Sequence, residues 1–348
     1  MKRKFSRSAR WIVAAGVIGV LWALCGAPGS QARARGGNAH GGDISGLLQT
    51  AQQQFGQGQY SAAITTLESA QSQNPGSAAT YFWMGRTFFE IGDFDGAIAQ
   101  FEKAVSLDGN SSEYHQWLGR AYGGKADKDK SFFVARNAKG QFETAVKLDP
   151  SNVAARRDLA DYCMNAPWIV GGSKDEALTQ VNAIAAINPV QGHLARAEYD
   201  MRVLKNPSKA ASEYQQVLAA KPQEVEPYLE AAAFFGQQNE LAQMNEAIDA
   251  LAQARPNDPR VTLYRGIYGV LSKTNLDSAE EDVKSYLAST PERSDWPSHS
   301  SARDWLGRLY EEKGNGVMAA EQYRAALQLD PENQDARERL QQLEKAVQ

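Results

Sequence analysis

The sequence predicts an all-α protein built as an α-solenoid, in which helix pairs stack one after another. Three observations lead to this prediction. Alanine-rich segments close on a proline or glycine at regular intervals, two distant segments share one pattern of small and aromatic residues, and the composition is that of a globular chain. The 348 residues are 43% hydrophobic and 22% charged, which argues against an intrinsically disordered protein.

The closing residues set the period of the repeat. They are Pro75, Gly109, Pro150, Pro189, Pro222, Pro256, Pro291 and Pro331, at spacings of 34, 41, 39, 33, 34, 35 and 40 residues. A fixed period of this size is typical of repeat proteins, in which each repeat is one supersecondary unit. The spacings therefore indicate a base period near 34 residues with three enlarged intervals.

The content of the repeats is also shared between segments 84–104 and 306–326. The matching residues are Gly85, Phe88, Gly92, Ala97, Phe101 and Ala104 in one, and Gly307, Tyr310, Gly314, Ala319, Tyr323 and Ala326 in the other. Small residues let two antiparallel helices approach closely, and the aromatic rings fill the space beside these contacts. The second glycine ends the first helix in a left-handed conformation, and the closing proline ends the second helix.

This pattern resembles the tetratricopeptide repeat (TPR) over about residues 44–348. The match is close in units 78–109 and 300–331, and good at 44–75. In 190–291 it rests mainly on alanines and closing prolines, and we expect less regular packing there. The resemblance implies about eight helix-turn-helix units in a right-handed superhelix.

These units should occupy 44–331, followed by a capping helix at 332–348. In that last segment Ala336, Leu340 and Leu343 fall on one helical face, and the rest is polar. A terminal repeat needs such a polar outer face for solubility.

The N-terminus has the layout of a secretory signal peptide over 1–34, with a flexible leader at 35–43. Basic residues precede an apolar run at 11–24, which is short for a membrane span of about 20 residues. We therefore expect a periplasmic or secreted protein. The alternatives are an uncleaved anchor and a lipid on Cys25.

The charge argues against a nucleic-acid-binding protein, and the cysteine content argues against a disulfide-stabilised one. Seven of the 37 Lys and Arg residues lie in 1–35, so the remaining 30 face 41 Asp and Glu, a formal net charge of −11. Such an acidic chain is a poor nucleic-acid binder, because phosphate contacts need clustered cations. Beyond the signal only Cys163 remains, so no internal disulfide is possible.

Two enlarged intervals fall in neighbouring repeats, the third and the fourth. In 123–146 we expect the second helix to begin earlier and run longer, with Phe132 in its apolar stripe and Asp127–Lys130 as a solvated turn. Insertions at equivalent turns of a solenoid emerge on one face, often the binding face.

The second enlarged interval contains the stretch 165–177, NAPWIVGGSKDEA. Ser173 and Glu176 form a capping box that should start a helix near Lys174. Ala166, Pro167, Gly171 and Gly172 resemble insertions in exported bacterial TPR proteins. A third expansion, 292–297, should be a surface loop.

Catalytic and metal motifs do not occur in the sequence. The stretch 165–177 lacks the G-x-x-x-x-G-K-[ST] order of a phosphate loop, and the four histidines have no metal-ligand spacing. We therefore expect no enzyme activity, metal or cofactor. An enzyme with its chemistry in the insertions, around Lys125–Ser131 and Trp168–Ser173, is the least favoured hypothesis.

Two sets of residues are candidates for partner contacts. In one, a Trp precedes an Arg by three residues on the same helix face: Trp83 with Arg86, Trp117 with Arg120, and Trp305 with Arg308. The other is Pro167, Trp168 and Ile169 in the expanded turn. In the alternative, each Trp packs against the next repeat while its Arg is solvated.

The sequence thus predicts a non-catalytic scaffold, exported across the inner membrane, that binds a protein or peptide. It would use its concave groove or the expanded face of repeats 3 and 4. No nucleic-acid partner is expected. The alternative is a membrane-tethered assembly component of the cell envelope, which requires an uncleaved or lipidated N-terminus.

Overall fold

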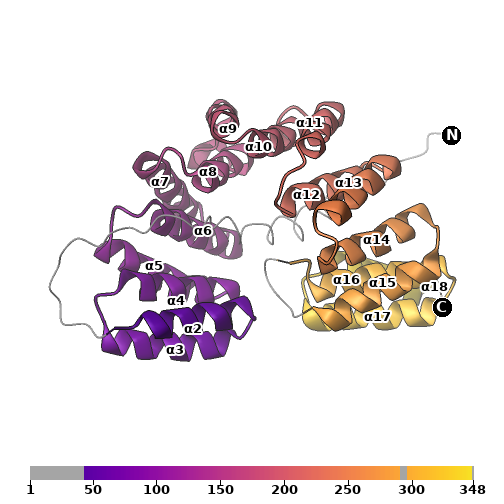
Figure 1. The fold of residues 1–348 in the computed structure, drawn as a ribbon, viewed down its shortest axis with the longest axis horizontal. Helices are drawn as coiled ribbons and strands as arrows, with labels where there is room; N and C mark the ends of the chain where they lie inside the picture. Colours follow the sequence, from indigo (N-terminus) through magenta and orange to yellow (C-terminus); the bar gives the residue numbers. More distant parts are fainter. Residues whose placement is uncertain (1–42, 291–295, 347–348) are drawn as a thin grey trace. The chain divides into compact units, whose positions relative to one another are not determined.

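The computed structural model describes residues 43–290 and 296–346. Within these ranges the chain forms 17 α-helices and one turn of 3-10 helix, and no strand is present there (Figure 1). This confirms the predicted all-α fold. The predicted signal peptide at 1–34 and all but the last residue of the leader lie outside the described residues.

Sixteen of the helices follow one another as eight helix-turn-helix units. The first four are α2 (Ser45–Gly56) and α3 (Tyr60–Gln73), α4 (Ala78–Glu90) and α5 (Phe94–Leu107), α6 (Ser112–Asp129) and α7 (Phe132–Leu148), and α8 (Val153–Asn165) and α9 (Lys174–Ile187). The other four are α10 (Pro189–Arg202) and α11 (Pro207–Ala219), α12 (Glu226–Gln237) and α13 (Leu241–Ala254), α14 (Pro259–Ser272) and α15 (Leu276–Ser289), and α16 (His299–Glu312) and α17 (Gly316–Leu329). Helix α18 (Gln334–Ala346) packs on α17 as the final element.

The chain divides into two compact units, and the boundary lies inside α11, between Glu213 and Tyr214. Helices α2 to α10 belong to the first unit, and α12 to α18 belong to the second. In each unit, consecutive helices pack against one another.

Close approach of the two helices of a repeat is made possible by glycine. A Cβ placed on Gly85 would lie 2.7 Å from the Phe101 ring, and one on Gly307 would overlap the Tyr323 ring even more closely. The ring therefore occupies the volume that a side chain would need. Phe101 and Tyr323 are both 0% exposed, so this contact is the core of its repeat.

The turn between the helices follows the predicted chemistry in the closely matching repeats. Gly92 and Gly314 have φ of +75° and +73°, a left-handed conformation that costs glycine little. Asp93 then caps α5, because its carboxylate accepts a hydrogen bond from the Gly96 amide at 2.9 Å. Repeats 5 to 7 use other residues for left-handed positions, namely Lys205, Lys221, Asn239, Lys273 and Asn275.

The first expansion differs from the prediction. It lengthens both helices of the third repeat, to 18 residues in α6 and 17 in α7, against 13 and 14 in α4 and α5. Asp127–Lys130 is therefore not a turn: its first three residues form the end of α6, and Lys130 follows with φ of 51°. Phe132 is 61% exposed and is not part of the buried stripe, which begins further along α7.

The second expansion forms a short, ordered turn. After α8, Pro167 leads into a single 3-10 turn, η1 (Trp168–Val170), and α9 begins at Lys174. Ser173 caps α9 as predicted, since its hydroxyl accepts the Glu176 amide at 3.2 Å. The Glu176 carboxylate instead accepts a hydrogen bond from Lys139 Nζ at 2.8 Å, which ties the cap to α7.

The described end of the third expansion packs on α14 and α15 within the second unit. The guanidinium of Arg260 lies 4.9 Å from the Trp296 ring centroid. The Tyr286 hydroxyl donates to the Pro297 carbonyl at 2.6 Å. Trp296 and Pro297 are half-buried, whereas Arg260 and Tyr286 are buried. Residues 291–295 lie outside the described ranges.

Substitution of Gly119 tests the close approach of α6 and α7. A Cβ there would lie 2.6 Å from the Phe142 ring and 3.2 Å from the Ala138 carbonyl oxygen, so we expect Gly119→Ala to destabilise the fold by about 1–3 kcal/mol. Gly123 lies one turn further along the same helix, where a Cβ meets nothing within 4 Å. Gly123→Ala should stabilise by about 0.5–1 kcal/mol. Urea unfolding of both variants checks this, and equal shifts would contradict the packing argument.

Candidate functional site

The Trp–Arg pairs of the second and third repeats form a stack between α4 and α6. The Arg86 guanidinium lies 3.7 Å from the Trp117 ring centroid, and the Arg120 guanidinium lies 4.4 Å from it. Trp117 and Arg86 are each only 6% exposed. Such desolvated cation–π contacts are stronger than exposed ones.

Arg120 continues this stack into the fourth repeat. Its Nε donates to the Asp158 carboxylate at 2.7 Å, and Gln116 Nε2 donates to the same oxygen at 2.7 Å. Burial raises the pKa of the Asp158 carboxyl, and the positive charge of Arg120 opposes this shift. The second, third and fourth repeats are therefore joined through buried charged groups.

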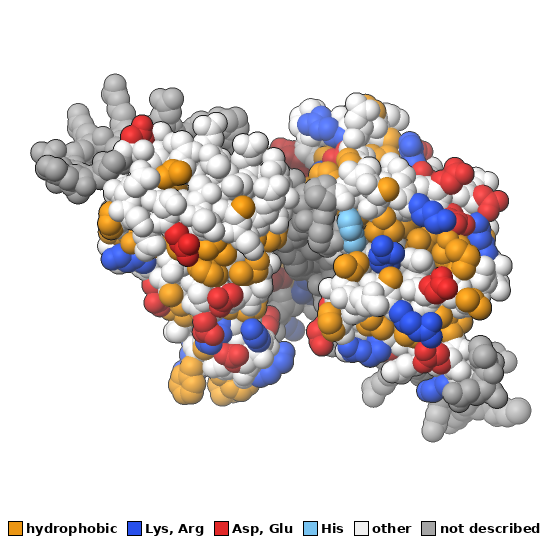
Figure 2. Space-filling view, turned by 90° about the horizontal axis from the view of Figure 1, so that it is seen from below, with side chains coloured by type: hydrophobic (Ala, Val, Ile, Leu, Met, Phe, Trp, Pro, Cys, Tyr) orange, Lys and Arg blue, Asp and Glu red, His pale blue; other side chains and the backbone are white. Residues whose placement is uncertain are grey.

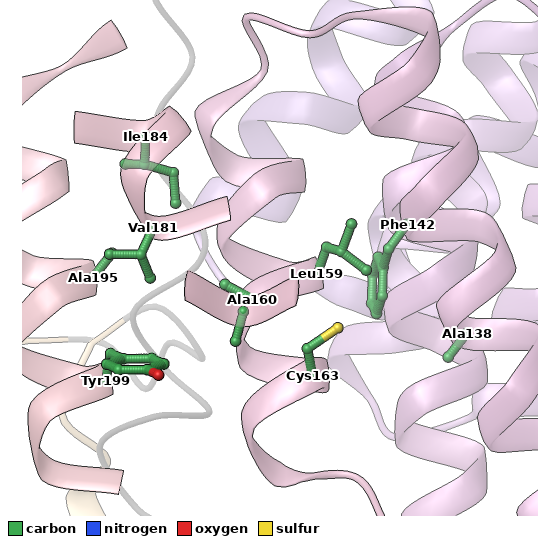
Figure 3. Packing of buried hydrophobic residues seen from close by; sticks show 10 residues of the cluster. Ala138, Phe142, Leu159, Ala160, Cys163, Val181, Ile184, Ala195 and Tyr199 are labelled. Atoms are coloured by element: carbon green, nitrogen blue, oxygen red, sulfur yellow. The ribbon is translucent and has the colours of Figure 1, made fainter. Parts of the chain in front are cut away.

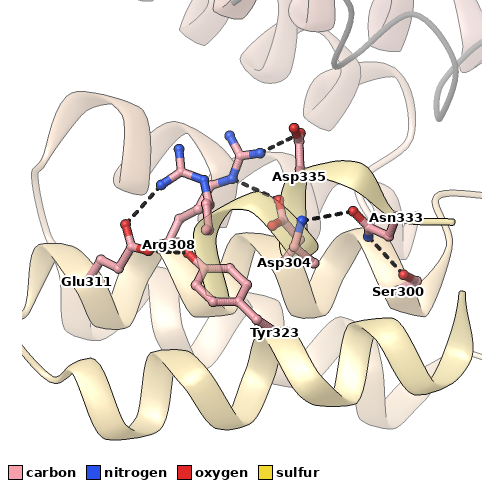
Figure 4. Close-up of polar contacts among 9 residues, drawn as sticks. Ser300, Asp304, Arg308, Glu311, Tyr323, Asn333 and Asp335 are labelled. Carbon is pink, nitrogen blue, oxygen red and sulfur yellow. Dashed lines mark hydrogen bonds and ion pairs between the residues drawn. The ribbon is translucent and has the colours of Figure 1, made fainter. Parts of the chain in front are cut away.

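The pair in the last repeat joins the capping helix in the same way. The Arg308 guanidinium lies 4.4 Å from the Trp305 centroid and bonds Asp304 at 2.8 Å and Asp335 of α18 at 2.7 Å (Figure 4). Burial raises the pKa of Asp304 to about 6, although Arg308 opposes the shift. Asn333 adds a second link, since its amide donates to the Ser300 hydroxyl at 2.9 Å.

These contacts change how the Trp–Arg pairs are interpreted. Trp83 and Trp117 pack against Phe55 and Phe89 of the preceding repeats, whereas the alternative hypothesis expected contact with the next repeat and solvated arginines. Arg86, Arg120 and Arg308 bridge neighbouring helices, and Trp83 and Trp305 are half-buried. The six residues leave little free surface, so a role in partner binding stays a prediction for them.

The expanded turns show the opposite behaviour. Trp168 is 84% exposed and Ile169 is 50% exposed, and Phe132 and Phe133 at the start of α7 are 61% and 83% exposed. We call these four residues the expanded edge. Pro167 beside them is also exposed. Pro167, Trp168 and Ile169 are partner-contact candidates predicted from the sequence, whereas the two phenylalanines are not. Their sequence signal is their position directly after the Ser131 cap.

One hydrogen bond connects the two halves of the edge. Arg136, one turn beyond Phe132 and Phe133 on α7, donates through Nη2 to the Ile169 carbonyl at 2.8 Å. Helix α7 also packs against η1. The two expansions therefore lie side by side.

The turn that carries Trp168 is anchored from below. Val170 is 3% exposed, and its carbonyl accepts the Tyr162 hydroxyl at 2.9 Å. A Cβ on Gly172 would lie within bonding distance of the Ala166 carbonyl oxygen, so only glycine fits there. The exposed side chains thus project from a constrained backbone.

Beneath the edge lies a buried cluster from α7, α8, α9 and α10 (Figure 3). Phe142, Leu159 and Cys163 meet at its centre. Burial raises the pKa of the Cys163 thiol to about 12. A thiol that stays protonated at neutral pH is a weak nucleophile, so this cysteine has a packing role.

An acidic pair lies on α8 and α10 of the same unit. Arg202 Nε bonds Glu198 at 2.9 Å, and its Nη1 lies 3.8 Å from the Asp161 carboxylate. Asn165 also donates to Asp161 at 2.7 Å. Burial, together with the neighbouring charge of Glu198, raises the pKa of Asp161 to about 7.

Residues 43–290 and 296–346 contain no cluster of His, Cys, Asp and Glu suited to hold a metal ion. None of their helices is both long and apolar enough to cross a membrane. His115, His193 and His299 bond Gln141, Glu213 and Thr290 respectively. On the surface shown in Figure 2, hydrophobic side chains are scattered among charged and uncharged polar groups.

Fold and surface together define a helical-repeat protein. Residues 54–121 and 268–334 match two family models, each described as tetratricopeptide repeat. These stretches include the second and eighth repeats, whose glycine–aromatic packing is given above. The chain is a tetratricopeptide-repeat protein.

Similar solved structures have low sequence identity. A tetratricopeptide repeat protein from Parabacteroides merdae is 15% identical, with 76% of this chain and 98% of that chain covered and a TM-score of 0.48. A chain of the APC/C hetero-tetramer Cut9-Hcn1 is 14% identical, with 85% of this chain and 55% of that chain covered and a TM-score of 0.48. The C-terminal part of a TPR repeat-containing protein from Cytophaga hutchinsonii is 17% identical, with 84% of this chain and 99% of that chain covered and a TM-score of 0.40. No curated protein matches the sequence.

Two tryptophans provide a test of packing against exposure. Trp117→Ala removes a buried ring that two guanidiniums cover, so it should lower the free energy of unfolding by about 3–5 kcal/mol. Trp168→Ala removes a ring that is 84% exposed, so it should change the free energy of unfolding by less than about 0.5 kcal/mol. Thermal unfolding followed by circular dichroism measures both. A large loss for Trp168→Ala would mean that this ring is part of the core.

Asp161 predicts a pH dependence of stability. Its pKa in the folded protein, about 7, lies above the unfolded value near 3.9, so the folded state retains a proton between about pH 4 and 7. Stability from this group is therefore present below the unfolded pKa and lost as pH rises through about 7. Asp161→Asn cannot titrate, so its melting temperature relative to wild type should rise from about pH 5 to pH 8. A difference that stays constant would refute the assignment.

Proposed function

We propose that the chain is a non-catalytic scaffold that binds a protein partner through the expanded edge. TPR repeats generally mediate contacts between proteins, and proteins of this family are generally non-catalytic scaffolds. The described residues are used almost entirely for repeats and their cap. In the first expansion, Lys125 is paired with Asp95 at 2.7 Å and with Asp129 at 2.9 Å.

The observation that carries the proposal is the exposure of four large apolar side chains on one constrained surface. Burying one such side chain is worth about 1.5–3 kcal/mol, so leaving four in water forgoes a sizeable stabilisation. Contiguous exposed apolar residues mark interaction sites. Trp is enriched among the residues that dominate binding energy. The fixed backbone of η1 lowers the entropy lost on binding.

The proposed location is the periplasm or the exterior of the cell. It is supported by the basic residues, apolar run and small-residue cleavage site of 1–34. The membrane-tethered alternative is supported by the same apolar run and by Cys25. Mass spectrometry of the mature protein separates them, since a free N-terminus near Arg33 or Arg35 excludes an anchor.

Photo-crosslinking tests the expanded edge directly. We place p-benzoylphenylalanine at Phe133 and, as a control, at Val317, which is 74% exposed in the second unit. We expect a defined protein adduct from position 133 and none from position 317. Adding Trp168→Ala should lower the adduct yield about tenfold, the effect of losing about 1.4 kcal/mol of binding.

A matched second substitution controls for non-specific effects. Val317→Ala, combined with the crosslinker at position 133, should leave the adduct yield unchanged. Equal adduct yields from positions 133 and 317 would show that the edge is not the binding surface. An adduct yield from position 133 that is unchanged by Trp168→Ala would show the same.

A further inference from the structure

We infer that the segment of the partner that binds the expanded edge combines apolar side chains with carboxylates. This inference rests on the proposed function and adds the chemistry of the ligand. The apolar part follows from Phe132, Phe133, Trp168 and Ile169. The acidic part follows from the charged residues around them.

Four exposed cations lie within five residues of the edge along the chain. Lys128 lies in the last turn of α6, Lys130 follows that helix, Arg136 lies one turn beyond Phe132, and Lys174 is the first residue of α9. None of the four forms an ion pair with a carboxylate of the described residues. Arg136 donates to a backbone carbonyl, which leaves its charge uncompensated.

Two other cations of the same expansions are compensated. Lys139 pairs with Glu176 at 2.8 Å and with Glu143 at 3.4 Å, and Lys125 pairs with Asp95 and Asp129. Four exposed cations without an ion pair therefore lie near the exposed apolar side chains. The chain beyond residue 35 is acidic overall, so this local excess is opposite in sign to the rest of the protein. A ligand with carboxylates complements it.

The charge pattern favours a protein segment over a flat anionic surface. Asp127 and Asp175 are exposed beside Lys128 and Lys174. A protein segment can place its carboxylates opposite the cations alone, whereas a membrane or nucleic acid presents negative charge to the aspartates as well. Like charges held opposite each other oppose binding.

The two components of the edge have different expected roles. The apolar residues supply affinity, because exposed ion pairs contribute little individually. The cations supply selectivity and faster association, and both effects weaken as salt screens the charges. A charge-reversed ligand should thus still recognise the apolar residues, but several-fold more weakly.

The probes are two fluorescent synthetic helical peptides that share a leucine face and carry either Glu or Lys on the other face. Fluorescence anisotropy with the full chain measures their dissociation constants at low and raised salt. We expect the Glu peptide to bind about tenfold more tightly at low salt, and the preference to shrink when salt is added. Trp168→Ala should weaken both peptides.

A matched pair of substitutions isolates the charge. Lys128→Glu reverses an exposed lysine in the last turn of α6 beside the edge, and it should reduce the preference for the Glu peptide about threefold. Lys147→Glu reverses an exposed lysine in the last turn of α7, about 20 Å along that helix from Phe132. It should leave the preference unchanged.

The outcomes separate the two proposals. If Trp168→Ala weakens both peptides but neither is preferred, the acidic ligand is refuted and the binding edge stands. If neither peptide responds to Trp168→Ala and position 133 yields no protein adduct, both proposals fail. Sedimentation with phosphatidylglycerol vesicles that depends on Trp168, without a preference for the Glu peptide, would identify a membrane surface and overturn the inference.

Discussion

The close approach of two helices around a glycine or alanine is the contact on which the rest of the structure depends. At Gly85, Gly119 and Gly307 an aromatic ring from the second helix of the repeat fills the space that a side chain would occupy. Each such contact buries its ring without help from distant parts of the chain. Stability is therefore assembled repeat by repeat, as expected of a solenoid.

Contacts between repeats include buried charged groups beside apolar ones. Arg86, Trp117, Arg120 and Asp158 form a continuous buried series from α4 to α8, and Arg308 and Asp335 do the same at the last repeat and its cap. Burying a charge is costly unless it is paired, so these groups specify how one repeat sits on the next. Residues that look suited to bind a ligand are thereby used to hold the array together.

The expanded edge arises where the third and fourth repeats depart from the common length. The first expansion extends α6 and α7 beyond the neighbouring helices and places Phe132 and Phe133 at the start of α7. The second adds η1, which Val170 and Tyr162 hold in place. Arg136 joins the two, so a pair of separate insertions becomes one surface with a cationic rim. Binding at this surface would leave the packing of the repeats unchanged.

The helix pairs, their period, the caps and the family resemblance can be read from the sequence, because these features depend on residues within about 40 positions of one another. Ser173 as the cap of α9 and Gly92 as the end of α4 are local signals of this kind. The repeats in 190–291 match the pattern less closely, since Lys273 and Asn275 take left-handed conformations that glycine takes in the closely matching repeats.

Which of the candidate residues are available to a partner depends on tertiary packing. Trp117 and Trp168 are both tryptophans in predicted binding positions, yet one is 6% exposed and the other 84%. The difference depends on which atoms of the neighbouring repeat lie against each ring. That in turn depends on the lengths of α6 and α7 and on the register between repeats, which residue spacing along one helix does not encode.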